Sequence, residues 1–153
     1  MKKTLLILAL AASSFLGAHA TLAQTAAPGD QLYKAFGEKQ GLGVLMDDFR
    51  TRLLADPRTG QHFKPANQQR VKEQLVEQFC ALGGGPCIYK GADMQSSHAN
   101  LDIKKSDFHA LVEVLQQSMD AKGIAFRKQN QMLALLAPMH RDIITPKEVA
   151  GQP

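Results

Sequence analysis

The feature that most constrains this chain is a helical spacing of apolar residues that recurs along most of its length. Apolar side chains return every three or four residues in four separate stretches, which is the period of one face of an α-helix. The sustained alternation of apolar and polar residues that indicates a half-buried strand is missing, and β-branched clusters are few. The chain is therefore predicted to be all-α.

Turn and capping residues set the bounds of the first helices. A short helix is predicted over 31–36, and a longer one over 42–54 that ends at Asp56-Pro57. Asn67 is a suitable N-cap for the next helix. The Gly-Gly-Gly-Pro run at 83–86 stops that helix, because three glycines and a proline do not continue a helical backbone.

Two further helices are predicted towards the C-terminus. Ser106 can cap a third long helix, which Gly123 stops. The last helix carries apolar residues between Met132 and Ile143, with a kink at Pro138, because proline lacks the N–H that the helix needs there. The stretch 88–103 is mostly polar and is predicted to be an irregular connection between the second and third long helices.

Residues 1–23 have the composition of a secretory signal peptide. Lys2 and Lys3 form the positive end, an apolar run covers 5–16, and small residues at 18–23 offer two cleavage sites. A membrane anchor is the alternative, but the apolar run is shorter than the roughly 20 residues that a span needs. We therefore expect an exported protein, most simply a periplasmic one, without a stable membrane anchor.

The remaining sequence is long enough for one domain with a single core. The chain has 153 residues and is 44% apolar. The expected division is a disordered segment at 24–29, one domain at 30–146 and a tail at 147–153. Beyond Lys2 and Lys3, 16 basic residues face 14 acidic ones, a balance that argues against a nucleic-acid partner.

One histidine has a context suited to metal binding. Met94 and His98 are four residues apart, so one helical turn aims both in the same direction, and Leu101 continues that stripe. On spacing alone, an ordinary core or surface histidine is the favoured interpretation of His98. Cys80 and Cys87, together with two histidines, would make a weak zinc signal whose spacing fits common zinc patterns poorly.

Several short motifs follow one another in an order that is more specific than any one of them. The most distinctive is Tyr89-x-Gly91-x-x-Met94-x-x-x-His98. The others, in order along the chain, are Asp48-Phe49 with Arg52, Leu54, Ala55 and Asp56; Phe63; Phe79 before the glycine run at 83–86; and Ile103 and Phe108. Together, over some sixty residues, they resemble a truncated hemoglobin of group 1, and the resemblance runs from Tyr33 to about Ile144.

This resemblance implies a two-over-two helical sandwich around heme b, with His98 as the proximal iron ligand. Val71 and Leu75 match positions of the distal helix that face the bound ligand. The residues that would wall the pocket are Phe49, Phe63, Phe79, Met94, Ile103, Phe108 and Val112. Ordinary core packing is the alternative for any single one of them. A porphyrin needs such an apolar slot, and one imidazole leaves the other iron face open to oxygen, nitric oxide or carbon monoxide.

The chain departs from the family pattern on the distal side. Arg50 replaces the distal tyrosine that usually hydrogen-bonds oxygen, and Leu75 stands where glutamine is frequent. Gln74 and Gln78 are nearby amides, and Gln74 is the distal candidate. We expect Arg50 to turn outward, towards Asp47, a heme propionate or water, because an unpaired guanidinium beside the heme would be costly. The opposing hypothesis is that Arg50 folds inward and donates to the ligand.

A disulfide between Cys80 and Cys87 is also predicted. Cys80 lies near the end of the distal helix and Cys87 just beyond its glycine break, and the three glycines between them let the chain fold back. Export favours this pairing, because disulfides persist in oxidising compartments. Two free thiols are the alternative.

Three functions remain open at this level. The first is a heme globin that binds a diatomic gas reversibly. The second is a heme enzyme for nitric oxide oxidation or peroxide chemistry, which would need an external electron donor. The third is a heme-free helical binding module in which His98 is incidental.

His62, beside Phe63, is a solvated corner histidine or, less favoured, a sixth iron ligand.

Overall fold

The computed structural model describes residues 29–144, and every regular element in that range is helical, as predicted. The predicted leader (1–23), nearly all of the predicted disordered segment (24–29) and the predicted tail (147–153) lie outside the described residues. No helix in the described range is long and apolar enough to span a membrane. The elements are α1 (Gln31–Ala35), α2 (Glu38–Ala55), α3 (Pro57–Phe63), α4 (Gln68–Leu82), α5 (Met94–His98), α6 (Lys105–Ala121), α7 (Phe126–Leu136), the 3₁₀ helix η1 (Ala137–Met139) and α8 (His140–Ile143).

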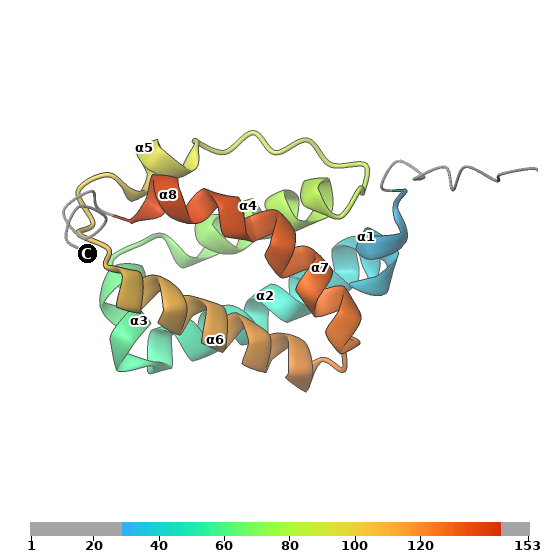
Figure 1. The fold of residues 1–153 in the computed structure, drawn as a ribbon, viewed down its shortest axis with the longest axis horizontal. Coiled ribbons are helices and arrows are strands. Elements are labelled where there is room, and N and C mark those ends of the chain that lie inside the picture. The colour runs from blue at the N-terminus through green and yellow to red at the C-terminus, as the bar shows by residue number, and fades with distance from the viewer. Residues whose placement is uncertain (1–28, 145–153) are drawn as a thin grey trace, which may run out of the picture.

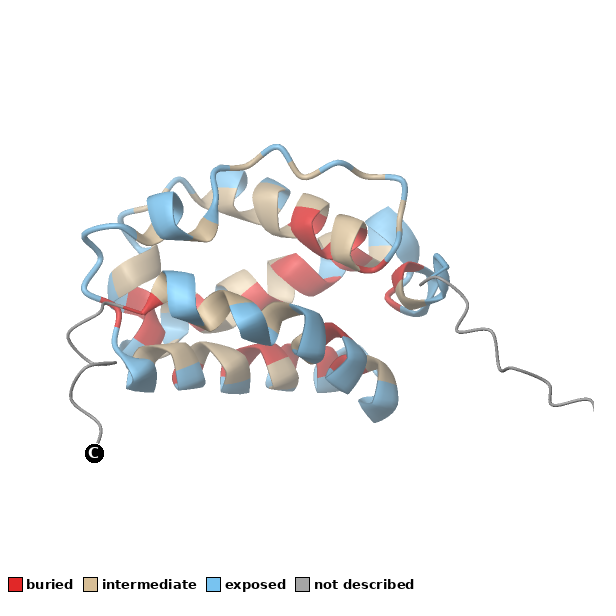
Figure 2. Ribbon diagram, turned by 45° about the horizontal axis from the view of Figure 1, so that its top comes forward, coloured by how far each residue is buried: buried red, intermediate tan, exposed pale blue. Residues whose placement is uncertain are grey.

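Helix α2 is the central element of the core. It packs against both α4 and α6, and its inward face carries buried side chains at helical spacing (Figure 2). These buried residues are Leu42, Leu45, Met46, Phe49 and Leu53. The helix begins at Glu38, four residues before the predicted start, and ends at Ala55 before the predicted stop at Asp56-Pro57. This helix therefore provides the rigid wall on which the other helices are positioned.

Helix α3 was not predicted from the sequence, where Asp56-Pro57 was interpreted as a stop. The same two residues also begin the next helix. The Asp56 carboxylate accepts a hydrogen bond from the Arg58 backbone N–H at 2.8 Å, and Pro57 takes the first helical position. The chain therefore turns directly from α2 into a seven-residue helix.

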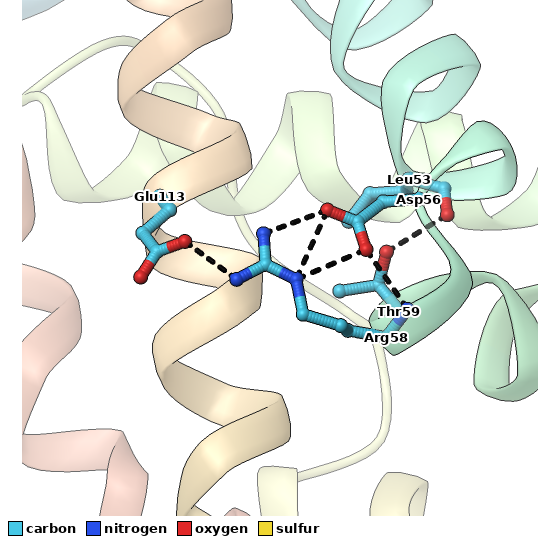
Figure 3. A network of polar contacts seen from close by, with 5 residues as sticks. All are labelled: Leu53, Asp56, Arg58, Thr59 and Glu113. Carbon is cyan, nitrogen blue, oxygen red and sulfur yellow. Dashed lines mark hydrogen bonds and ion pairs between the residues drawn. The ribbon is translucent and has the colours of Figure 1, made fainter.

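A polar network holds α3 against α2 and α6 (Figure 3). The Arg58 guanidinium pairs with Asp56 and reaches Glu113 of α6, with 2.7 Å between Nη1 and Oε2. The Arg58 side chain also holds the pKa of the Asp56 carboxyl below its ordinary value. The buried Thr59 hydroxyl donates to the Leu53 carbonyl at 2.8 Å. These contacts come from three elements, so they fix the corner that leads to Phe63.

Helix α4 has the predicted start and the predicted end. The Asn67 side chain accepts the Arg70 N–H at 3.0 Å, which confirms it as the N-cap, and the helix stops at Leu82 before the glycine run. The Gly83 carbonyl accepts the Tyr33 N–H at 2.9 Å, so the end of α4 also anchors α1. Residues 83–93 then connect α4 to α5 without a helix, along one edge of the molecule (Figure 1).

The predicted disulfide between Cys80 and Cys87 is present. The Gly85 N–H donates to the Cys80 carbonyl at 2.8 Å, so the chain folds back within the glycine run as expected. Cys80 is fully buried in the core beneath this turn. The disulfide thus ties the connection that leads to α5 covalently to the end of α4.

The bounds of the last helices are partly as predicted. Helix α6 begins at Lys105, so Ser106 is not its N-cap; the Asp107 carboxylate instead reaches back to accept the Lys104 N–H at 3.0 Å. Gly123, with a φ of +67°, follows the helix as predicted. The predicted kink at Pro138 is confirmed, because α7 ends at Leu136 and a 3₁₀ turn separates it from α8.

Replacing Cys80 and Cys87 together by alanine tests the contribution of the disulfide to stability. We expect the free energy of unfolding to fall by about 2 kcal/mol, because the unfolded chain loses a constraint on a short loop. Urea unfolding measures it. A reductant should lower the stability of the native chain and leave that of the double variant unchanged; equal stability of the two oxidised proteins would contradict the prediction.

Candidate functional site

A large cavity lies among the helices of the described domain. Its volume is about 840 Å³, and its walls come from α2, α3, α4, α5, α6, α7 and the turns between them. Single small-molecule and cofactor sites occupy roughly 300–1,000 Å³, so a large ligand fits. Helices α5 and α8 lie side by side at one end of the molecule, while α3 lies against α6 (Figure 1). The cavity is therefore enclosed by elements far apart in the sequence.

The structure brings the predicted wall residues, the two distal-helix residues and His98 together around this cavity. The lining includes Phe49, Phe63, Val71, Leu75, Phe79, Met94, His98, Ile103, Phe108 and Val112. Most of these side chains are aliphatic or aromatic, as a slot for an apolar disc requires. Gln74 also lines the cavity, whereas Arg50 does not. Contact of these residues with a heme stays a prediction.

His98 is held in a defined orientation by its own helix. Its ring Nδ1 lies 2.7 Å from the Met94 carbonyl oxygen, which can only accept a hydrogen bond, so Nδ1 carries the proton. The neutral ring then has its free electron pair on Nε2. Metal-binding histidines commonly donate their other N–H to a backbone carbonyl in this way. His98 is half-buried and lines the cavity, so its geometry suits a metal ligand.

Helix α5 is short and is positioned mainly by polar contacts. Asp93 caps it, accepting the Ser96 N–H at 2.7 Å, and this backbone bond holds the pKa of the Asp93 carboxyl below its ordinary value. The buried Gln78 amide of α4 lies 3.8 Å from the Met94 sulfur and 3.5 Å from the Met139 sulfur. Gln78 therefore connects α4 with the His98 helix and with the 3₁₀ turn, a role that sequence reasoning missed.

The wall opposite α5 contains one amide with an unused acceptor. Gln74 Oε1 is buried and has no hydrogen-bond partner among the described residues. Gly91 lies close to Gln74 and to the Tyr89 hydroxyl, and a Cβ at Gly91 would collide with both. Tyr89 donates to the Ala92 carbonyl at 3.0 Å, and burial raises its pKa. The Gln74 amide is therefore a polar group available inside the cavity.

Arg50 lies outside the cavity lining and is paired with an acid. Its Nη2 lies 3.7 Å from Asp47 Oδ1, and the same carboxylate binds Lys72 Nζ at 2.7 Å. The outward orientation towards Asp47 was one of those expected, and the hypothesis that Arg50 folds inward is not supported. Arg50 Nε is buried and has no hydrogen-bond partner among the described residues, so the role of Arg50 as a distal pocket candidate stays a prediction.

The other histidines have more ordinary surroundings. His62 lines the cavity, but its Nε2 lies 3.3 Å from the Asp107 carboxylate, so it is a paired histidine at the corner rather than a solvated one. His109 also lines the cavity, and His140 packs edge-on against Phe108. The weak zinc interpretation fails, because both cysteines are in the disulfide and no cluster of three or more ligands occurs within 29–144.

Comparison with known proteins identifies the family. The family model described as bacterial-like globin matches residues 31–145. The chain belongs to this globin family. It is 31% identical over 114 residues to a group 1 truncated hemoglobin of Mycolicibacterium paratuberculosis, covering 74% of this chain and 84% of that one. A group 1 truncated hemoglobin of Tetrahymena thermophila is 27% identical over 94 residues, covering 61% and 78%.

Solved structures agree on the fold of this globin. The truncated hemoglobin of Tetrahymena pyriformis in its Fe(III) form matches with a TM-score of 0.71 at 23% identity, covering 74% of this chain and 97% of that one. The 2/2 hemoglobin of Synechococcus sp. matches with a TM-score of 0.69 at 18% identity, with the same coverage. This is the predicted two-over-two sandwich, with α2 and α4 as one helix pair and α6 and the α7–α8 unit as the other.

The residues around the cavity of this globin suit a heme. The cavity is large and mostly apolar, and an imidazole with a free electron pair lines it. Both are what a porphyrin with a single protein ligand on its iron requires. The residues fit, in agreement with the heme-binding character of the family.

Proposed function

We propose that this globin binds heme b with His98 as the proximal iron ligand and takes up a diatomic gas on the opposite side. Oxygen, nitric oxide and carbon monoxide are the candidate gases. When bound, the heme would supply an iron with one coordination position left for the gas. The single observation that carries the proposal is the hydrogen bond from His98 Nδ1 to the Met94 carbonyl, which leaves Nε2 as the donor.

The other residues around the cavity have separate roles in this proposal. The hydrogen bond to Met94 fixes the ring of His98 and makes Nε2 more basic, as outer partners of metal ligands do. The aromatic side chains of the walls, Phe49, Phe63 and Phe79 among them, offer apolar surface against which the heme would pack. Val71 and Leu75 present apolar surface on α4, while Gln74 can donate its amide N–H to a bound gas.

Export to the periplasm is part of this proposal. The disulfide between Cys80 and Cys87 supports it, because such bonds persist in oxidising compartments and are rare in the cytosol. N-terminal sequencing of the protein recovered from its native cell compartment tests it. We expect a periplasmic protein whose chain begins just after residue 20 or 23. A cytoplasmic protein that still begins at Met1 would contradict the proposal.

Substitution of His98 by alanine tests the ligand assignment. We expect the variant to lose most of its heme, because the Nε2 donor is removed and an alanine methyl group cannot bind iron. The visible absorption spectrum of the purified protein measures both the heme content and the iron environment. His109→Ala is the matched control, since His109 lines the same cavity. A native spectrum in His98→Ala, or heme loss in His109→Ala alone, would overturn the assignment.

Two further variants locate the group that contacts the gas. Replacing Gln74 by leucine removes the amide from the cavity, so oxygen should leave about two- to tenfold faster, which is the value of one neutral hydrogen bond. Arg50→Ala should leave that rate unchanged, because Arg50 lies outside the cavity and pairs with Asp47. Stopped-flow measurement of the rate of oxygen release shows whether Gln74 or Arg50 contacts the gas. Faster release from Arg50→Ala, with Gln74→Leu unaffected, would reverse the assignment.

A further inference from the structure

The methionines within residues 29–144 fall into two groups. Three of them, Met46, Met119 and Met132, are fully buried and belong to the core. The other two, Met94 and Met139, are half-buried and line the cavity. Oxidation of a methionine sulfur requires that the oxidant reach it. Among these five side chains, the two in the cavity wall are therefore the ones open to oxidation.

The two cavity methionines come from distant parts of the sequence and meet at one amide. Met94 begins α5, whereas Met139 ends the 3₁₀ helix η1. Figure 1 shows α5 beside α8, which directly follows η1. The Gln78 side-chain nitrogen lies 3.8 Å from the Met94 sulfur and 3.5 Å from the Met139 sulfur. One side chain of α4 therefore contacts both sulfurs.

The Gln78 amide has weak acceptors for a buried donor. Gln78 is only 8% exposed. Within the described range, the acceptors that its side-chain nitrogen contacts are the two thioether sulfurs, and a thioether accepts a hydrogen bond only weakly. A buried donor with a poor partner recovers little of the free energy that it lost on leaving water. The amide N–H groups are therefore available to a stronger acceptor placed on either sulfur.

We propose that Met94 and Met139 form an oxidation site for hydrogen peroxide, and that Gln78 binds the resulting sulfoxide oxygen. A lone pair of the sulfur attacks one peroxide oxygen, so an S–O bond forms while the O–O bond breaks. The sulfur loses two electrons, and the leaving hydroxide takes the proton from the transferred oxygen and becomes water. The new oxygen is a strong acceptor on an atom that Gln78 already contacts. Methionine sulfoxide reductases reverse the modification.

This modification acts on the link between α4 and the helix that bears His98. A weak contact from the Gln78 N–H to sulfur is replaced by a hydrogen bond to oxygen. Met94 also accepts the hydrogen bond from His98 Nδ1 through its backbone carbonyl. None of these contacts involves heme. The site therefore connects a chemical oxidant to the position of α5.

Treatment of the purified protein with hydrogen peroxide, followed by peptide mapping with mass spectrometry, tests which methionines react. We expect Met94 and Met139 each to gain one oxygen atom before any of the three core methionines does, because peroxide reaches the cavity wall first. Equal oxidation of all five side chains, earlier oxidation of the core ones, or no oxidation of the cavity pair would each overturn the inference.

The role of Gln78 is tested by the effect of oxidation on stability. Urea unfolding before and after peroxide treatment gives the folding equilibrium constant of the native protein, Gln78→Leu and Gln131→Leu. We expect oxidation to lower this constant about two- to tenfold more in Gln78→Leu than in the native protein, which is the value of one neutral hydrogen bond. Gln131 is the matched control, because it is an exposed glutamine of α7 that does not line the cavity, and its variant should respond as native.

A double variant, Met94→Leu with Met139→Leu, separates this site from damage elsewhere, because leucine keeps the volume of methionine without its sulfur. Peroxide should leave its stability unchanged; a loss in it as large as in the native protein would place the damage outside the site. Equal effects of oxidation on the native protein and Gln78→Leu would show that the amide does not bind the sulfoxide.

The infrared S=O stretching band of the oxidised native protein gives a second measure of the Gln78 contact that needs no variant. A hydrogen bond to the sulfoxide oxygen lowers the frequency of this band. We expect a lower frequency in the folded oxidised protein than in the same protein with Gln78→Leu or, should that variant not fold, in an oxidised methionine peptide in an aprotic solvent. A frequency equal to that of the peptide would refute the role of Gln78.

Discussion

The arrangement of this globin is governed by an apolar cavity of about 840 Å³ inside a small helical domain. Water can enter but finds few hydrogen-bond partners on walls of aromatic and aliphatic side chains. We therefore expect the cavity to bind an apolar ligand. A porphyrin disc is such a ligand, and its binding would raise the free energy of unfolding, because only the folded chain binds it.

The two sides of the cavity are held in different ways. The α4 side is packed on the buried face of α2, and side chains such as Val76 and Phe79 are buried in the same core. Helix α5 itself contains no buried residue. Its position depends on the Asp93 cap, the Gln78 contact with Met94 and the disulfide-tied connection before it. The histidine is thus carried by a short helix that is held by these contacts and by its packing against α8.

The sequence predicted the long helices well, because their apolar spacing and their breaking residues are local signals. Asn67, the glycine run and Pro138 all act within a few residues of themselves. Helix α3 was missed because seven residues are too few for a periodic pattern, although Asp56-Pro57 was also a start signal. Ser106 was the wrong cap because Asp107, at the third helical position, supplied the bond to Lys104 instead.

The site was predictable only in part, for a physical reason. The pocket-lining residues follow from family motifs whose order along the chain is visible. Pairings between distant segments are not: Gln78 meets Met139 across 61 residues, and His62 meets Asp107 across α3 and α6. Such features depend on the fold, which local patterns do not specify.

The central claim is that this chain encloses one heme and binds its iron through a protein imidazole. Titration of the heme-free protein with hemin, followed by visible absorption, tests it most directly. We expect a sharp Soret band that grows linearly and stops at one hemin per chain, with a spectrum typical of a histidine-bound iron. A spectrum that remains that of free hemin, with no end point, would contradict it.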